Sequence, residues 1–162
     1  PDLLLWLQEN MPLHKLGNIF DPGVDVVFFG EGYGGKIQRD KIPYRRTPNF
    51  RLFDILVTRG TRETRNKPLW LEWPDVQEIA NRLGIECVPQ LGEAATIADA
   101  ISYVEELSVV ATEESNIVKM PEGVVARTVP QLLDKKCKRI MWKIKRQDFD
   151  AINLESGEVI LC

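Results

Sequence analysis

The sequence predicts an α+β fold in which the strands pair largely antiparallel. The helical and strand patterns follow one another as a helix, two strands, two helices with a short strand between them, and two further strands. This order lacks the regular strand–helix alternation that is typical of parallel sheets. The length of 162 residues fits one domain with a sizeable core, so we expect a single domain over residues 1–162.

The first half of the chain predicts one helix and two strands. Residues 2–10 are expected to form a short helix, because an aspartate can cap it and its leucines and tryptophan supply one apolar face. β-Branched and aromatic residues predict strands at 24–29 and 50–57. The glycines within 30–35 predict a flexible hairpin turn between them. The basic segment 58–68 has no apolar side chain and predicts a solvated loop.

The second half predicts two helices and three strands. Segment 74–84 has a proline in its first turn, one apolar face and a terminal glycine, which together indicate a helix. Segment 96–107 predicts a second helix, whose first residues have the spacing of a capping box. Strands are expected at 85–91, between these helices, and later at 123–128 and 139–145.

The composition argues against several classes of protein. A net charge of −3 disfavours broad, non-specific coating of nucleic acid, which needs a basic face. No apolar run approaches the ~20 residues of a membrane span, so no membrane partner is expected. The three cysteines lack metal-ligand spacing, which is typical of a protein in the reducing cytoplasm. A single histidine disfavours a histidine-based triad or a multi-histidine metal site.

Two lysines near the end of the chain suggest an anion site. In the strand expected at 139–145, alternation puts Ile140, Trp142 and Ile144 on one face. It puts Met141, Lys143 and Lys145 on the other, with the two lysines about 7 Å apart. Two ammonium groups that close repel each other unless something anionic lies between them, and phosphate fits that requirement. The alternative is an ordinary pair of surface lysines.

Two glutamates next to glycines lie at the ends of expected strands. Glu31 lies between glycines at the end of the strand expected at 24–29, and Glu122 precedes a glycine at the start of the strand expected at 123–128. Either can be an ordinary turn carboxylate. The glycines around Glu31 do not form a phosphate-binding P-loop, because the Lys-Ser/Thr pair and the following helix are missing.

An aromatic side chain on the strand expected at 50–57 is a candidate for stacking on a nucleobase, which is worth ~1–3 kcal/mol per base. Alternation puts Arg51, Phe53 and Ile55 on one face of this strand, and Phe50, Leu52 and Asp54 on the other. Packing of the aromatic ring in the core is the alternative.

Taken in order, these stretches resemble a known superfamily. "FFGEGYG" (28–34), "FRLFDI" (50–55), "EGVVAR" (122–127) and "WKIK" (142–145) are similar to motifs III, IIIa, IV and V of the covalent nucleotidyltransferases. This superfamily contains ATP-dependent DNA and RNA ligases and mRNA capping enzymes, and the wording of the motifs is closest to phage and bacterial RNA ligase-like proteins. The resemblance implies a nucleotidyltransferase (adenylation) domain with two mostly antiparallel sheets and flanking helices.

The resemblance also implies a reaction and its ligands. In an ATP-dependent RNA ligase, a lysine attacks the α-phosphate of ATP and becomes lysyl-AMP, AMP passes to the 5′-phosphate of a nucleic acid, and a 3′-hydroxyl seals the strand. The cofactors would be ATP and Mg²⁺ or Mn²⁺, and the partners RNA strand ends, or DNA ends. Lys143 and Lys145 would bind the α-phosphate and stabilise its developing charge.

The other motif residues take roles by the same resemblance. Glu31 would contact the ribose, and Phe53 would stack on adenine, with Phe50 as the second candidate. Glu122 would help to hold the divalent metal, directly or through water. We therefore expect Glu31, Glu122 and the two lysines to converge on one cleft.

One motif of the superfamily is missing. Motif I, Lys-x-Asp-Gly or a near variant, should lie several dozen residues before motif III, and no lysine of this sequence starts it. Lys15 is the nearest match, but its glycine, Gly17, is one position too early and Glu31 follows only sixteen residues later. We expect that the sequence begins after motif I, that it holds a partial domain, and that this chain alone forms no covalent AMP adduct.

Two alternatives to an RNA ligase stay open. One is a DNA ligase or a capping-type nucleotidyltransferase. The other is a non-catalytic relative that binds a nucleotide or nucleic acid. An in-frame motif I upstream of Pro1 would favour the enzymes. Neither the oligomeric state nor the biological substrate follows from the sequence.

Overall fold

The computed structural model describes residues 2–37, 44–60, 67–105 and 121–150. These residues form a mixed α+β structure with two separate sheets and helices, so the expected fold class is confirmed. The chain divides into two compact units, Pro1–Pro89 and Gln90–Cys162. The single partial domain expected from the sequence stays a prediction.

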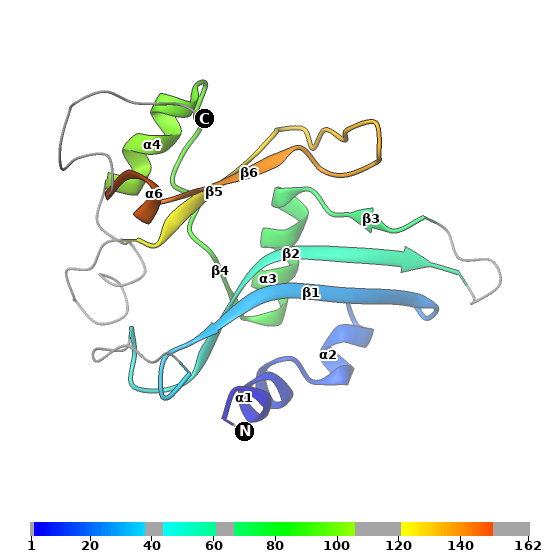
Figure 1. Ribbon diagram of the computed structural model, residues 1–162. Coiled ribbons are helices and arrows are strands. Elements are labelled where there is room, and N and C mark those ends of the chain that lie inside the picture. The colour runs from blue at the N-terminus through cyan, green and yellow to red at the C-terminus, as the bar shows by residue number, and fades with distance from the viewer. Residues whose placement is uncertain (1, 38–43, 61–66, 106–120, 151–162) are drawn as a thin grey trace, which may run out of the picture. The chain divides into compact units, whose positions relative to one another are not determined.

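The described residues of the first unit form a four-stranded sheet and three helices (Figure 1). Its elements are α1 (Asp2–Asn10), α2 (Leu13–Gly17), β1 (Val24–Tyr33), β2 (Asn49–Arg59), β3 (Leu69–Trp70), α3 (Trp73–Leu83) and β4 (Glu86–Cys87). β2 pairs antiparallel with β1 and β3, and its Asn49 end pairs in parallel with β4. The short elements α2 and β3 were not expected, and the strand expected at 85–91 is reduced to the two residues of β4.

The second unit is built on a two-stranded antiparallel sheet. Its elements are α4 (Ile97–Glu105), β5 (Gly123–Arg127), β6 (Met141–Lys145) and the short α6 (Gln147–Asp150). β6 begins two residues later than expected, because Arg139 only forms an isolated bridge with Leu133. The last two residues of the helix expected at 96–107 lie outside the described residues, as do 61–66 of the expected basic loop.

A β-bulge in β2 corrects the expected strand faces. Phe29 pairs with Asp54 and the next residue, Gly30, pairs with Leu52, so the register skips Phe53. The extra residue shifts the alternation by one position. Ile55 therefore packs in the same buried cluster as Leu52, so its expected place on the face of Arg51 is wrong. The expected place of Asp54 on the face of Leu52 is wrong for the same reason.

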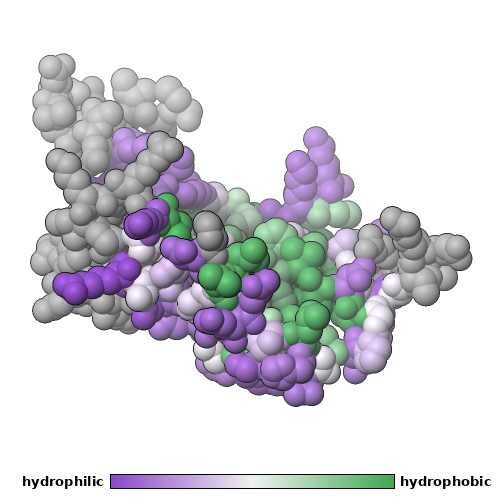
Figure 2. Space-filling view, turned by 90° about the horizontal axis from the view of Figure 1, so that it is seen from below, coloured by the Kyte–Doolittle hydropathy of each residue, from purple (hydrophilic) through white to green (hydrophobic). Residues whose placement is uncertain are grey.

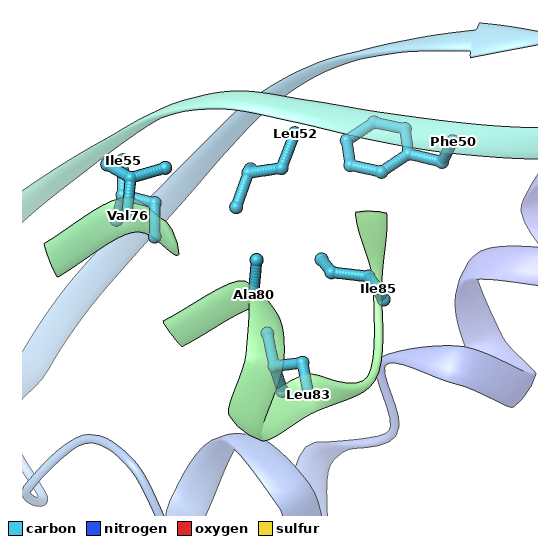
Figure 3. Close-up of a cluster of buried hydrophobic side chains, with 7 residues drawn as sticks. All are labelled: Phe50, Leu52, Ile55, Val76, Ala80, Leu83 and Ile85. Carbon is cyan, nitrogen blue, oxygen red and sulfur yellow. The ribbon is translucent and has the colours of Figure 1, made fainter. Parts of the chain in front are cut away.

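The core of the first unit lies between β2 and α3. Figure 3 shows the side chains of β2 directed toward those of α3 and of the residue that follows it. The buried members of this cluster are Phe50, Leu52, Ile55, Val76, Ala80, Leu83 and Ile85. α3 begins at Trp73 with a proline in its first turn and ends at Gly84, whose φ of 73° is the left-handed conformation that glycine adopts most readily. The helix expected at 74–84 is thus confirmed.

The glycines after Phe29 serve two different purposes. Gly30 and Gly32 lie within β1, where a Cβ atom would collide with the Phe50 ring and with Leu3, respectively. Gly34 and Gly35 have φ values of 78° and 55° and form the turn. The expectation that all of these glycines form a turn is therefore wrong, because the first two allow close packing against the strand.

The core of the second unit is small. Ile144 of β6 is buried against Ala100 and Val104 of α4, with Val124 of β5 packed beside it. The start of α4 has the expected capping box: the Asp99 carboxylate accepts a hydrogen bond from the Thr96 backbone N–H (2.8 Å), and the Thr96 hydroxyl accepts one from the Asp99 N–H (3.2 Å).

Apolar side chains also reach the surface. Large hydrophobic residues of α1 and α2, among them Leu4, Leu5 and Leu13, are exposed. Figure 2 shows hydrophobic side chains gathered between hydrophilic ones on the face that it views. Within the described residues, none of the helices combines the length and the apolar character needed to cross a membrane.

Candidate functional site

The exposed face of β6 carries two of the candidate residues. Ile144 is buried, and alternation turns Lys143 and Lys145 to the other face of the strand. Their partners on β5 are Val125 and Gly123. Ile140, Trp142 and Ile144 were expected to share an apolar face. Ile144 is buried, whereas Ile140 is 39% and Trp142 is 43% exposed.

A glycine brings the two strands close together at this point. A Cβ atom on Gly123 would collide with the carbonyl oxygen of Ile144 and lie 2.9 Å from the Cα atom of Lys145. Real side chains do not tolerate such contacts, so position 123 requires glycine. Close packing between the two strands therefore explains the glycine of the Glu122-Gly123 pair.

Glu122 and Lys143 meet at this end of the sheet. The Lys143 ammonium Nζ lies 3.3 Å from Oε1 of Glu122, and the two side chains are 48% and 77% exposed. A backbone hydrogen bond from Arg146 to the Glu122 carbonyl (2.9 Å) extends the strand pairing past Glu122. Because both charges face solvent, either can exchange its partner for a ligand at low cost.

The donor atoms at this site fit part of a magnesium site. A carboxylate oxygen is a ligand that Mg²⁺ prefers, and Mg²⁺ commonly takes one or two carboxylates together with water and substrate phosphates. Glu122 supplies such an oxygen. Among the described residues, no group of three His, Cys, Asp or Glu side chains is arranged to hold a metal by itself.

The first unit carries the other two candidates, Glu31 and Phe53. Glu31 is exposed on β1 and pairs in register with Arg51 of β2. Phe53 is half-buried and is the extra residue of the bulge. Phe50 is buried in the core and its ring lies 6.2 Å from that of Trp6, so it packs inside the unit.

A buried polar network lies beside Glu31, and the sequence did not predict it. The Tyr33 hydroxyl accepts hydrogen bonds from Asn49 Nδ2 (2.8 Å) and from Arg51 Nε (3.2 Å), and it donates one to Glu86 (3.3 Å). Arg51 also forms an ion pair with Glu86 (3.2 Å) and donates to the Cys87 carbonyl (3.1 Å). The network therefore ties β1, β2 and β4 together.

The network also affects the neighbouring thiol. Burial raises the pKa of Cys87 above its ordinary value, and the positive charge of Arg51 partly opposes this rise. Cys87 thus remains a neutral thiol over the physiological pH range. A neutral, half-buried thiol is a weak nucleophile, so this cysteine is a packing residue.

Lys15 has a structural contact. It lies in the last turn of α2 and its Nζ donates a hydrogen bond to the carbonyl of Leu83, at the end of α3 (3.2 Å). Orphan carbonyls at helix ends commonly accept such bonds from lysine. This contact ties α2 to the end of α3, and the expectation that Lys15 is not the nucleophile stays a prediction.

The five candidates are divided between the two units. Glu31 and Phe53 belong to Pro1–Pro89, and Glu122, Lys143 and Lys145 belong to Gln90–Cys162. The structure brings Glu122 and Lys143 into contact within their own unit. The convergence of all the charged candidates on one cleft stays a prediction, as do their roles.

Comparison with known proteins identifies the family. A search of curated proteins finds no match to this chain. A family model described as RNA ligase matches residues 3–145, which include all the candidate residues and most of the chain. The match spans both compact units and implies an RNA substrate for the family. This chain therefore belongs to the RNA ligase family.

Proposed function

We propose that this chain is the nucleotide-binding part of an ATP-dependent RNA ligase. In the first step a lysine amine attacks the α-phosphate of ATP, which forms a nitrogen–phosphorus bond and releases pyrophosphate. The RNA 5′-phosphate then attacks this AMP and frees the lysine. Finally a 3′-hydroxyl attacks the activated 5′-phosphate, which forms the phosphodiester and releases AMP.

The observation that carries the proposal is the charged face of the smaller sheet. Lys143 and Lys145 lie on the face opposite the buried Ile144, and Glu122 lies 3.3 Å from Lys143. Two adjacent ammonium groups can bind the oxygens of the α-phosphate and stabilise the charge that develops on them. In this role both would bind phosphate as ammonium groups, so the nucleophile would be a different lysine.

Glu122 would hold Mg²⁺ or Mn²⁺, directly or through water, after releasing its contact with Lys143. The metal would supply charge neutralisation to the phosphates as pyrophosphate leaves. When ATP binds, the α-phosphate replaces the carboxylate as the partner of Lys143. The Glu122–Lys143 pair thus keeps both groups in place in the absence of the ligand.

The first unit would bind the nucleoside. Glu31 would accept a hydrogen bond from the ribose, and Phe53 would stack on adenine. The polar network of Tyr33, Arg51 and Glu86 would fix the strand next to Glu31.

Labelled nucleotide distinguishes this function from its alternatives. We expect the chain to bind ATP in the presence of Mg²⁺ and to prefer it to GTP, as measured by equilibrium dialysis. Changing Lys143 and Lys145 together to alanine should abolish binding, whereas Lys67→Ala, an exposed lysine outside the site, should not. A preference for GTP would favour a capping-type enzyme, and failure to bind either nucleotide would overturn the proposal.

Covalent labelling tests where the nucleophile lies. We infer that the nucleophilic lysine belongs to a motif I outside this sequence, so incubation with α-labelled ATP should leave no label on the denatured chain. An acid-labile labelled band that is lost in Lys15→Ala would show that Lys15 is the nucleophile. Strand sealing would be measured with a protein that contains both motif I and this chain, on RNA and on DNA substrates that carry a 5′-phosphate. Sealing of RNA but not of DNA would identify an RNA ligase, and the reverse a DNA ligase.

A further inference from the structure

The segment between β5 and β6 forms an ordered hairpin extension, residues 128–140, which we call the basic hairpin. Leu133 and Arg139 form an antiparallel bridge, and the Ile140 N–H donates to the Leu132 carbonyl (2.8 Å). The Thr128 hydroxyl accepts a hydrogen bond from the Leu132 N–H (2.8 Å). Figure 1 shows this segment, coloured from yellow to orange, continuing beyond the two strands.

Asp134 fixes the tip of the basic hairpin. Its carboxylate Oδ1 accepts hydrogen bonds from the backbone N–H groups of Lys136 (2.8 Å) and Lys138 (2.9 Å). Its own N–H donates to the Lys138 carbonyl (2.7 Å), and its carbonyl accepts from the Cys137 N–H (3.0 Å). The backbone of the tip is therefore shaped by bonds that use no basic side chain.

The tip concentrates positive charge in an otherwise acidic chain. Residues 134–139 hold three lysines, one arginine and one aspartate, so their net charge is 4 − 1 = +3, against −3 for the whole chain. Lys135, Lys136 and Lys138 are exposed. Across the described parts of the chain, no acidic side chain pairs with any of these three lysines.

We propose that the basic hairpin binds the phosphate backbone of the RNA strand whose end is joined. Charge complementarity carries this proposal: three exposed ammonium groups on a preformed turn suit a polyanion, and phosphate contacts by lysine do not depend on base sequence. The assignment of RNA as the polyanion, rather than an anionic lipid surface or an acidic protein, rests on the proposed function.

The geometry gives the binding site a length. The chain runs from the tip directly into β6, and Lys143 of the candidate phosphate site lies five positions after Lys138. Five extended residues span about 16 Å. This distance exceeds the spacing of adjacent phosphates, so a strand bound at both places has to span several nucleotides. A mononucleotide should therefore gain nothing from the basic hairpin.

The salt dependence of RNA binding tests the proposal. The probe is a fluorescent, 5′-phosphorylated RNA of 20 nucleotides, and the test variant changes Lys135, Lys136 and Lys138 to glutamine. The matched control changes three exposed basic residues of the first unit, Arg59, Lys67 and Arg82, to glutamine, so both variants have a net charge of −3 − 3 = −6.

Loss of three phosphate contacts has a defined size. The slope of log K against log[salt] should decrease by about 2, and affinity at 0.1 M salt should fall up to about 100-fold, whereas the control variant should keep the slope of the unmodified chain. Equal slopes for the two triple variants would overturn the proposal. Binding of the unmodified chain to phosphatidylserine vesicles but not to RNA would also overturn it.

ATP binding by the unmodified chain, measured in parallel, separates this inference from the proposed function. In one outcome, the salt slope of RNA binding depends on the tip lysines but the chain does not bind ATP. This outcome would overturn the proposed ligase chemistry and support the basic hairpin as an RNA site. In the other outcome, the chain binds ATP and the salt slope of RNA binding is unchanged when the tip lysines are replaced. This outcome would support the ligase chemistry and overturn the inference.

Discussion

Two ion pairs of nearly equal length lie in the two sheets of this protein. Arg51 and Glu86 approach to 3.2 Å in the larger sheet, and Lys143 and Glu122 approach to 3.3 Å in the smaller one. The Arg51 side chain is only 10% exposed, whereas that of Lys143 is 48% exposed. Arg51 also has hydrogen bonds to Tyr33 and to the Cys87 carbonyl.

This difference separates a structural pair from an exchangeable one. A buried guanidinium that loses its partners stays desolvated and unpaired, so the structure keeps the Arg51 pair closed. An exposed pair contributes ~0–1 kcal/mol, so the Lys143 pair opens easily for a ligand. Distance alone would have assigned both pairs the same role.

The largest expected effect is on chemistry at the smaller sheet. With motif I supplied, Lys145→Ala should lower the sealing rate about 10²–10³-fold, because one charge-stabilising group is lost from the transition state. Thermal unfolding should be nearly unchanged, since Lys145 is on the face opposite Ile144. A variant that unfolds but keeps its activity per folded molecule would make Lys145 structural.

The larger sheet should respond in stability instead. Arg51→Met should lower the free energy of unfolding by about 1–3 kcal/mol, because the Cys87 carbonyl and the Tyr33 hydroxyl lose a partner. The pKa of the Cys87 thiol should rise further, since Arg51 lowers it in the folded protein.

Urea denaturation and the pH dependence of Cys87 alkylation measure these two effects of Arg51→Met. Lys143→Met is the matched control, because it removes the cation of the exposed pair and should change the stability by less than about 1 kcal/mol. Equal losses of stability in the two variants would contradict the distinction between the pairs.

The exposed carboxylate should matter for the metal and little for stability. Glu122→Gln keeps the shape of the side chain and should change the free energy of unfolding by less than about 1 kcal/mol. The Mg²⁺ concentration for half-maximal activity should rise ~10-fold or more, since a carboxylate ligand is lost. An unchanged Mg²⁺ requirement together with a clear loss of stability would show that the Glu122 pair is structural after all.

The smallest expected effect concerns Asp99, an exposed carboxylate fixed by local hydrogen bonds. Its pKa lies below its ordinary value of 3.8, first because of its hydrogen bonds with the Thr96 side chain and backbone. The stabilisation of α4 by this carboxylate is therefore present above pH 3.8 and lost as the pH falls through the lower folded-state pKa.

An NMR titration of Asp99 measures this pKa. Thr96→Ala should raise the pKa toward 3.8, whereas Thr96→Ser, which keeps the hydroxyl, should preserve the shift. If the alanine variant titrates like the unmodified protein, the Thr96 hydroxyl does not contribute to the capping box.

Local signals in the sequence were sufficient for part of this structure. The ends of α3 and the capping box of α4 were predictable, because proline, glycine, Thr96 and Asp99 act on their own neighbours. The alternation of Lys143 and Lys145 against Ile144 was predictable for the same reason. The charged pair Glu122–Lys143 joins two strands, and its contact follows from the antiparallel pairing of β5 and β6.

Other features depend on contacts that no local pattern encodes. The bulge at Phe53 adds one residue to a strand whose composition suits either alternation. The Tyr33–Arg51–Glu86 network requires the parallel pairing of β4 with β2, and a two-residue strand leaves no periodic signal. The antiparallel pairing of β1 and β2 could have indicated the network. It places Glu31 opposite Arg51 and Tyr33 opposite Asn49, so polar residues face each other across the two strands.

The bulge divides β2 into two segments whose side chains alternate with different phases. Residues up to Leu52 are in one phase, residues from Asp54 onward are in the other, and Phe53 marks the change. Deleting Phe53 would remove the bulge and leave a regularly alternating strand, in which Leu52 and Ile55 still lie on the core side. Inserting one residue further along β2 would instead turn the core residues beyond it to the opposite face of the sheet.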